Sequence, residues 1–301
     1  MKAVVLTVYG DVSGLEIREI PEPAPGAHEI LVRMAGASIN PIDWKLRSGA
    51  LRAYMPLQLP TILGNDASGE VIAVGSRVTS FKVGDRVLGR AKATYAELIV
   101  GPADNWASVP AKMDVADAGA LPVVVLTGAQ LIEEAIDARE GATILITGAT
   151  GSVGRVAVFA ARARGARVWA GVRRVHKAEA EKLGAAGVVA LDDDAEVDRL
   201  PPLDAIADTV GGETTKKLLG RVKPGGVIGS VVGEPAGAKE RGLVVNGMVS
   251  HADSRRLAQL AAAVAEGKLV VPIARSFPLA QAREAHRFAE RGAGGKVLLT
   301  G

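Results

Sequence analysis

The chain has 301 residues, of which 48% are hydrophobic and 23% charged, the balance of a globular protein with a sizeable core rather than of a disordered one. Its net charge of +3 is too small to indicate a nucleic-acid or membrane-surface partner. The absence of cysteine excludes disulfides, thiolate metal sites and cysteine nucleophiles.

Two apolar segments could indicate secretion or insertion into a membrane, and neither has the required length. The apolar run Ala3–Leu6 is too short for the core of a secretory signal. The longest uncharged stretch, Ala118–Ile132, is shorter than the ~18 residues that a membrane span needs, and Pro122 interrupts it. We therefore expect a cytoplasmic protein without membrane contact.

Residues 1–115 read as short strands separated by glycine and proline, and no apolar stripe at helical spacing exceeds two turns. This pattern predicts a β-rich barrel or sandwich. The expected strands are Ala3–Val8, Ile30–Met34, Ser68–Val74, Asp85–Leu88 and Tyr95–Val100.

From residue 116 onward, strands alternate with helices. Ala116–Ala138 is compatible with helix, and Thr143–Thr147 is a β-branched run typical of a strand buried on both faces. The alternation predicts an α/β fold with a parallel sheet and helices on both faces. The last two strands either extend this sheet or return to the first domain. Further expected elements are the helices 153–161, His176–Leu183, Glu213–Arg221 and Ser254–Glu266 and the strands Arg167–Val172, Val188–Leu191, Asp204–Thr209, Gly226–Val232, Val270–Ala274 and Val297–Thr300.

A glycine-rich turn, Gly148–Gly154, joins the strand Thr143–Thr147 to the helix that follows. At such a turn Gly151 lets the backbone approach a pyrophosphate, and Gly154 lets the helix pack on the strand. Ala149 occupies the first glycine position of G-x-G-x-x-G, so the fingerprint is only partly met, and a plain tight turn is the alternative. We expect a dinucleotide to bind at Gly148, Ala149, Gly151, Ser152, Val153 and Gly154.

The residues after the second strand of this unit favour NADPH over NADH. An NAD site usually carries Asp or Glu about 20 residues after the glycine turn, where it binds the ribose 2′-hydroxyl. Here Arg173, Arg174 and Lys177 occupy that region, and the first acid is Glu179. Arginine can hold a phosphate with two hydrogen bonds. These cations therefore either bind a 2′-phosphate or form an ordinary solvated loop.

Two other nucleotide-binding classes do not fit the sequence. Short-chain dehydrogenases need a Tyr-x-x-x-Lys pair, and none of the three tyrosines has a lysine four residues later. A P-loop needs Ser or Thr after Gly-Lys, whereas Lys268 and Lys296 are followed by Leu269 and Val297.

Further motifs follow one another along the whole chain. They are Asn40-Pro41-Ile42-Asp43, Arg47-Ser48-Gly49, Leu63–Gly69, Gly84–Val87, Tyr95–Glu97, Leu126–Gly128, Asp208–Gly212, Phe277–Leu279, Ala285-His286 and Gly295–Leu298. In this order they resemble the medium-chain dehydrogenase/reductase superfamily, in the version of its zinc-free quinone oxidoreductases (the zeta-crystallin-like group) and their 2-alkenal reductase relatives.

The resemblance implies an architecture of two domains. A chaperonin-10-like (GroES-like) β-rich catalytic domain would comprise residues 1–115 plus 268–301. A Rossmann-type doubly wound parallel sheet for NADPH, residues 116–267, would be inserted in it. The resemblance also places the active site in the cleft between the domains and implies a homodimer.

The resemblance further implies that no metal is bound. Zinc-dependent members carry Cys at the position of Asn40 and His at that of Asn65, and the stretch Pro122–Val125 offers no third ligand. The cysteine loop of the structural zinc is missing after Gly89. The histidines have no ligand spacing, so we expect surface or packing roles for His28, His176, His251 and His286.

Without a metal, hydride transfer suits an acceptor that is already electrophilic, such as a quinone or an α,β-unsaturated carbonyl. By resemblance, Asn40 orients the substrate or the nicotinamide carboxamide, unless it is a plain turn residue. Asp43 either shapes that loop or relays a proton. Tyr54 is the candidate donor to the developing enolate, although its spacing from Gly49 departs from the family pattern.

The remaining candidates lie near the expected coenzyme. Thr127 resembles a family threonine beside the nicotinamide, and Gly211 and Gly233 follow strands whose ends the coenzyme crosses. Lys296 is expected to anchor the last strand or the cleft, and Asp66 to be structural. The sequence thus predicts an NADPH-dependent, zinc-free oxidoreductase of quinones or α,β-unsaturated carbonyls. The alternatives are enone or enoyl-thioester reduction as the main role, or an NADPH-binding sensor or structural protein of low turnover.

Overall fold

The computed structural model describes residues 1–301, and the chain divides into two compact units. The first unit is discontinuous, Met1–Val123 with Ala252–Gly301, and the second is Val124–His251. The first unit is therefore larger than the predicted catalytic domain at both junctions. Two helices account for the difference, because α2 (Val115–Ala118) packs on strands β3 and β5 and α8 (Ser254–Ala265) packs on β8.

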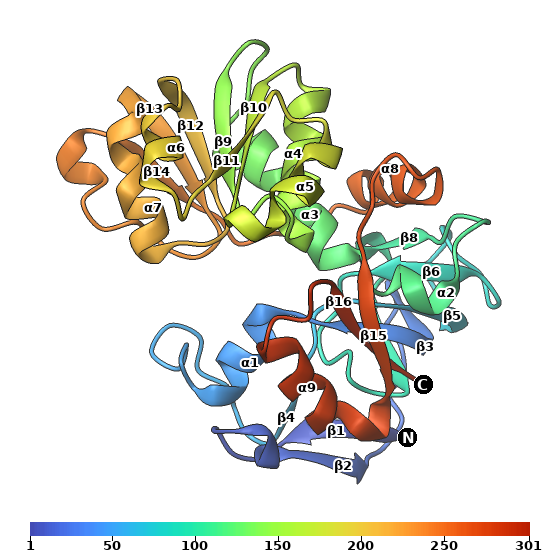
Figure 1. The fold of residues 1–301 in the computed structure, drawn as a ribbon. Coiled ribbons are helices and arrows are strands. Elements are labelled where there is room, and N and C mark those ends of the chain that lie inside the picture. Colours follow the sequence, from blue (N-terminus) through green and yellow to red (C-terminus); the bar gives the residue numbers. More distant parts are fainter. The chain divides into compact units, whose positions relative to one another are not determined.

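The first unit contains two sheets (Figure 1). One has the strand order β15-β16-β3-β5-β6-β8, with β7 also paired to β3, and the other has the order β2-β1-β4. Their strands are β1 (Lys2–Leu6), β2 (Leu15–Glu19), β3 (Glu29–Ile39), β4 (Thr61–Ile62), β5 (Ala67–Val74), β6 (Arg86–Gly89), β7 (Leu98–Pro102), β8 (Trp106–Ser108), β15 (Ile273–Pro278) and β16 (Lys296–Thr300). The helices α1 (Pro41–Ser48) and α9 (Ala282–Glu290) complete this unit.

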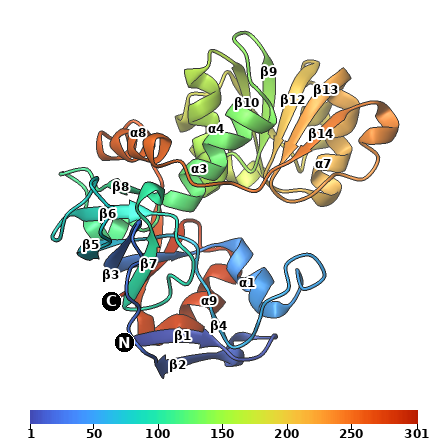
Figure 2. The same ribbon diagram turned by 180° about the vertical axis from the view of Figure 1, so that it is seen from behind.

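The C-terminal strands return to the first unit, which decides between the two alternatives left open by the sequence. Strand β16 pairs antiparallel with the long strand β3, and β15 pairs parallel with β16 (Figure 1). Strand β7, labelled beside β3 in Figure 2, pairs antiparallel with β3 as well. The predicted strand Val270–Ala274 instead begins at Ile273, because Pro272 has no N–H to donate to a sheet. Helix α9 was not predicted; it turns Ala285 and His286 into the core.

The second unit is an α/β unit with one parallel sheet, in the order β11-β10-β9-β12-β13-β14. Its strands are β9 (Thr143–Thr147), β10 (Arg167–Val172), β11 (Gly187–Ala190), β12 (Leu203–Asp208), β13 (Val222–Ser230) and β14 (Val244–Gly247). Its helices are α3 (Pro122–Gln130), α4 (Ser152–Ala163), α5 (Lys177–Ala180), α6 (Asp194–Asp198) and α7 (Gly212–Leu218). The predicted parallel sheet is confirmed, with β9 and β10 matching their predicted bounds, whereas β14 was not predicted.

The helical stretch Val115–Ala135 is longer than the uncharged run suggested. It has 21 residues, and its most apolar window of 18 residues has a mean hydropathy of 1.7, so by length and composition alone it could cross a membrane. The length argument made from the sequence is therefore wrong for this stretch. Since 72% of its most apolar window is buried inside the protein, packing in the core accounts for the same composition.

Candidate functional site

The glycine turn after β9 has the geometry of an anion-binding site. Gly148 has a φ of 62°, which favours glycine, and the amide of Gly151 donates to its carbonyl oxygen at 2.9 Å. A Cβ on Gly154 would overlap that same oxygen, so glycine is what allows α4 to begin here. The first helical hydrogen bond of α4 is that of Arg155 to Gly151, at 2.9 Å. The amides of Ser152 and the next two residues thus remain available to an anion.

A pocket of about 470 Å³ opens beside this turn, at the carboxyl ends of β9, β10, β11 and β12. Ligands of doubly wound sheets bind at such ends. Val172, Leu191 and Val210 give it apolar walls. The full lining is Gly148, Thr150, Val172, Arg173, His176, Leu191, Asp192, Val210, Glu213, Thr214 and Lys217.

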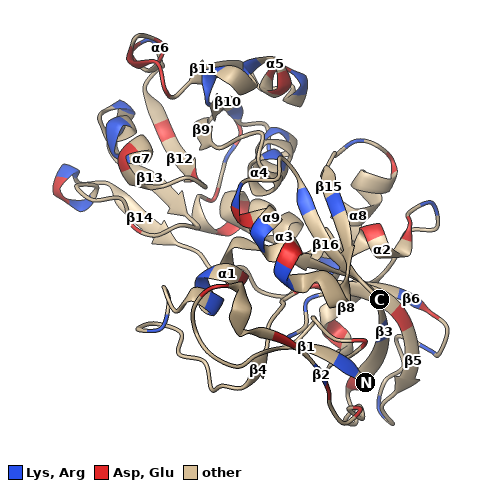
Figure 3. Ribbon diagram, turned by 60° about the horizontal axis from the view of Figure 1, so that its bottom comes forward, with Lys and Arg blue, Asp and Glu red and all other residues tan.

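The three cations predicted to bind a 2′-phosphate are placed differently. Arg173 lines the pocket. Arg174 forms an ion pair with Asp193, and Lys177 contacts both carboxylate oxygens of Glu196 at 2.8 Å. Figure 3 shows the two signs of charge intermixed around β10, β11, α5 and α6. Of the three, Arg173 alone is a pocket residue.

Sequence reasoning missed four charged or titratable residues of the pocket. His176 lies 3.1 Å from a terminal nitrogen of Arg173, and Asp192 follows β11 and accepts a backbone hydrogen bond at 2.8 Å. Glu213 and Lys217 come from α7. Asp192 was within reach of the sequence, because it comes directly after the predicted strand Val188–Leu191.

The predicted glycines after β12 and β13 lie at loops with left-handed backbone. Gly211 has a φ of 75° and Gly233 a φ of 111°. The buried carboxylate of Asp208 fixes the first loop, since its Oδ1 accepts from the Gly211 amide at 2.9 Å, Thr147 Oγ1 at 2.9 Å and Thr215 Oγ1 at 2.7 Å. Asp208 therefore orders the β12 end of the sheet beside the glycine turn.

Two other predicted coenzyme residues are already bonded within the second unit. The nearly buried Thr127 donates to Ser250 Oγ at 2.9 Å, and the buried Ala149 donates its amide to Gly171 at 3.1 Å. Ala149 thus ties the turn to β10, and Thr127 ties α3 to the segment after β14.

In the first unit, Asn40 is the centre of a buried polar network. Its Nδ2 donates to Ser38 Oγ and to Asp66 Oδ1, both at 3.2 Å, and its Oδ1 accepts from Lys296 Nζ at 2.6 Å. Ser38 Oγ lies 2.9 Å from both Asp66 oxygens. Asn40 is only 2% exposed. Its carboxamide is therefore held between charged partners, which sets it apart from a plain turn residue.

Asp43 extends this network at the start of α1. It accepts hydrogen bonds from the Asn40 amide and from Tyr95 Oη, each at 2.8 Å, and from Asn65 Nδ2 at 2.9 Å. Burial raises the pKa of Asp43 to about 6, although these donors work against the shift. The geometry gives Asp43 a loop-holding role; a proton relay through it stays a prediction. Ser38, Asn40, Asp43, Asn65, Asp66, Tyr95 and Lys296 are called the buried network below.

Tyr54 does not join the buried network. It is 86% exposed, in the turn after α1. The structure thus brings Asn40 and Asp43 together and leaves Tyr54 outside, and its role as a donor stays a prediction.

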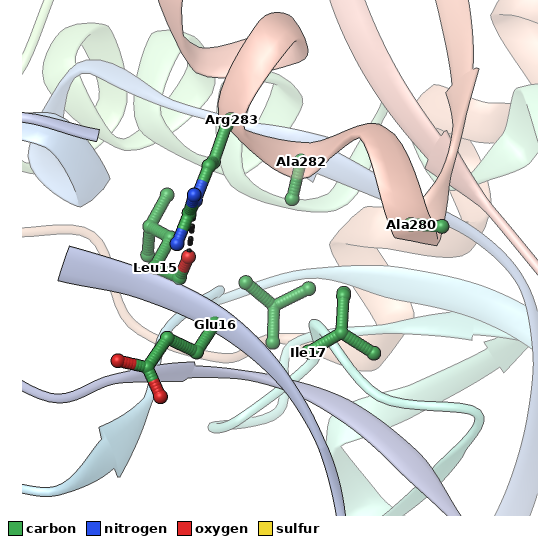
Figure 4. Close-up of a pocket in the computed structure, with 7 residues that line it drawn as sticks. Leu15, Glu16, Ile17, Ala280, Ala282 and Arg283 are labelled. Carbon is green, nitrogen blue, oxygen red and sulfur yellow. Dashed lines mark hydrogen bonds between the residues drawn. The ribbon is translucent and has the colours of Figure 1, made fainter. Parts of the chain in front are cut away.

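A second pocket, of about 410 Å³, lies in the first unit beside β2 and the start of α9 (Figure 4). The small side chains of Ala280 and Ala282 leave it hollow. Arg283 donates from Nε to the carbonyl oxygen of Leu15 at 2.6 Å, so its guanidinium already has a backbone partner. This pocket carries none of the predicted site residues.

Comparison with known proteins identifies the family. The chain matches the model of the alcohol dehydrogenase GroES-like domain over residues 26–111 and that of a zinc-binding dehydrogenase over residues 183–299. A quinone oxidoreductase from Pseudomonas aeruginosa is 32% identical over an alignment that covers 99% of both chains. The chain belongs to the medium-chain dehydrogenase/reductase superfamily.

Further relatives and solved structures show how much of the chain is matched and how similar it is. An acryloyl-coenzyme A reductase from Metallosphaera sedula is 30% identical, over 76% of this chain and 75% of its own. The chain spans about half the length of several curated relatives, among them a chloroplast envelope quinone oxidoreductase homolog from Arabidopsis thaliana, 34% identical over 56% of this chain and 55% of its own.

The structure of a quinone oxidoreductase from Coxiella burnetii has a TM-score of 0.89 and 30% identity, covering 100% of this chain and 99% of its own. That of Escherichia coli quinone oxidoreductase complexed with NADPH has a TM-score of 0.87 and 27% identity, with both chains covered fully. The predicted fold class is thus confirmed.

The buried network does not fit the zinc ion for which one matching family model is named. Asn40 Oδ1 already faces the ammonium of Lys296, which would repel a second cation. Both oxygens of Asp43 accept hydrogen bonds, so they would have to give these up to bind a metal. Asn65, at the position of the zinc-binding His, offers an amide in place of an imidazole.

Proposed function

We propose that the protein transfers a hydride from NADPH to quinones or α,β-unsaturated carbonyls without a bound metal. The observation that carries this proposal is the pocket at the glycine turn, which is lined by Gly148 and Thr150, just before the start of α4, and by Arg173. When bound, NADPH supplies the hydride. The fold it shares with a quinone oxidoreductase that holds NADPH supports the proposal.

The residues of the second unit fit NADPH. Gly154 lets α4 begin directly against the turn, and the amides at the start of α4 can then face a pyrophosphate. The apolar walls formed by Val172 and Leu191 suit a flat adenine ring, and Arg173 suits the 2′-phosphate. These groups bind and orient the coenzyme, and they need no metal ion.

A substrate panel tests the proposal. Oxidation of NADPH is followed with quinones, 2-alkenals and a crotonyl thioester, before and after dialysis against a chelator. We expect turnover with quinones that survives the chelator. The acryloyl-coenzyme A reductase relative favours the enoyl-thioester alternative, which a higher kcat/KM on the thioester would establish. Tight NADPH binding without oxidation of any acceptor would instead support the sensor or structural role.

We also propose a homodimer formed through β14. This strand is at the edge of the parallel sheet, and Val244 and Val249 leave 47% and 85% of their surfaces exposed in or just after it. Unpaired strand edges are templates for pairing with another chain. Light scattering at the mass of one chain would contradict this proposal. The cytoplasmic location expected from the sequence stays a prediction.

A further inference from the structure

The coenzyme pocket contains a cation that comes from a part of the chain remote from the Arg173 loop. Lys217, in α7, lines the same pocket as Arg173. We infer that Lys217 is a second specificity-determining residue, which favours a dinucleotide with a phosphate on its adenosine ribose over one with a free hydroxyl. This inference rests on the proposed function, because it concerns the same site.

The charge of the pocket favours a second cation. Asp192 and Glu213 also line it, and Glu213 already pairs with Lys216 at 3.3 Å. The remaining carboxylate, Asp192, offsets the single charge of Arg173. A 2′-phosphate, like other phosphate monoesters, carries about −1.5 to −2 charges at neutral pH and would gain little from a lining without net positive charge. Lys217 supplies that positive charge, and the incoming phosphate then meets two cations.

Lys217 is also more readily available than the neighbouring cations. Lys177 is bound to both oxygens of Glu196, with the two side chains 31% and 21% exposed. Lys217 makes a single contact of 3.1 Å with Asp194, whose side chain is 80% exposed. Exposed ion pairs are weak and screened by salt. The ammonium of Lys217 can therefore exchange Asp194 for a phosphate at little cost.

The test compares Lys217→Met with Lys216→Met, using kcat/KM for NADPH and for NADH with one quinone at fixed ionic strength. Lys216 is the matched control, because it precedes Lys217 in the same helix, is 55% exposed and does not line the pocket. It pairs with the pocket residue Glu213, whose side chain is 80% exposed, so its loss removes one weakly held positive charge without removing a lining residue. We expect Lys217→Met to lose about tenfold with NADPH through KM, with NADH changed less than twofold. Lys217→Arg should retain the NADPH preference, and Lys216→Met should change neither coenzyme more than twofold.

The outcomes separate this inference from the proposed function. Equal losses in Lys217→Met and Lys216→Met, or no loss in either, would overturn the role of Lys217 while the wild type still uses NADPH. A wild type that oxidises neither coenzyme, with every acceptor in the panel, would overturn the proposed function itself. A loss in Lys217→Met that is equal for NADPH and NADH would show that Lys217 supports the fold or the common part of the coenzyme, and would also overturn the inference.

Discussion

The buried network and the coenzyme pocket hold their charges in opposite ways. In the network, Asp43, Asp66 and Lys296 are at most 4% exposed, and each is fixed by neighbouring side chains or amides. In the pocket, Arg173 and Lys217 lie at the surface. Buried charges that lose a partner cost several kcal/mol, whereas exposed ones cost little. We therefore expect substitutions in the network to change stability and substitutions in the pocket to change coenzyme affinity.

The largest effect should come from Lys296→Met, which removes the donor to Asn40 Oδ1 and one of the positive charges that lower the pKa of the buried Asp66. We expect a loss of about 3–5 kcal/mol in the free energy of unfolding, measured in urea. Lys268→Met is the control, because Lys268 pairs with Glu266 at the surface, and it should cost less than about 0.5 kcal/mol. Equal losses in the two variants would break the contrast between buried and exposed charges.

Asp43 should make the stability of the protein depend on pH. Its folded pKa of about 6 exceeds the ordinary value of 3.8, so the folded state binds a proton that the unfolded chain releases. The resulting stabilisation is complete below pH 3.8 and is lost as the pH rises through 6. It amounts to about 3 kcal/mol in total.

Unfolding of the wild type and of Asp43→Asn, measured from pH 8 to pH 4, isolates this contribution, since other groups titrate alike in both. The wild type should gain stability relative to the variant as the pH falls. Parallel curves would show that Asp43 is not the group that titrates.

Gly154→Ala tests the glycine turn in the second unit. The new Cβ would overlap the Gly148 carbonyl oxygen, so α4 must move from its place. We expect NADPH affinity to fall about a hundredfold, about 2.7 kcal/mol, in calorimetry. Gly220→Ala is the control, because its Cβ would meet only Arg241, at 4.0 Å. Unchanged affinity in Gly154→Ala would mean that the coenzyme does not use this turn.

The smallest effects should separate the two arginines after β10. Arg173→Met should lower kcat/KM for NADPH about tenfold, because it removes a pocket cation, whereas Arg174→Met should change it less than twofold. Steady-state kinetics with NADPH and NADH measures both. If Arg174→Met lowered kcat/KM for NADPH more than Arg173→Met did, the ion pair between Arg174 and Asp193 would have to open when the coenzyme binds.

The sequence predicted the glycine turn and the strands around it because those signals are local. The apolar and β-branched composition of Thr143–Thr147 is enough to indicate a buried strand. The spacing of Gly151 and Gly154 can likewise be recognised without reference to residues far away in the sequence. The short edge strand β14 was missed because its four residues are mostly exposed, and α9 was missed because charged residues surround its few buried ones.

The buried network could not be predicted, because it joins residues far apart in sequence. Lys296 and Asn40 are separated by 256 positions, and nothing near either one indicates the other. Which of the predicted cations can face the pocket also depends on the fold. Arg174 and Lys177 were neutralised by the acids at 193 and 196, which only the packing of β10 against β11 brings within reach.

The return of β16 to β3 has a consequence for biosynthesis. Residues 124–251 form a continuous unit that can fold as soon as it leaves the ribosome. Synthesis of the first unit begins earlier, but that unit must wait, because Lys296–Thr300, a partner of its long central strand, is made after the whole second unit. A nascent chain halted before Lys296 would therefore carry a finished second unit and an open β-sheet, whose exposed edge invites chaperones until β16 has been made.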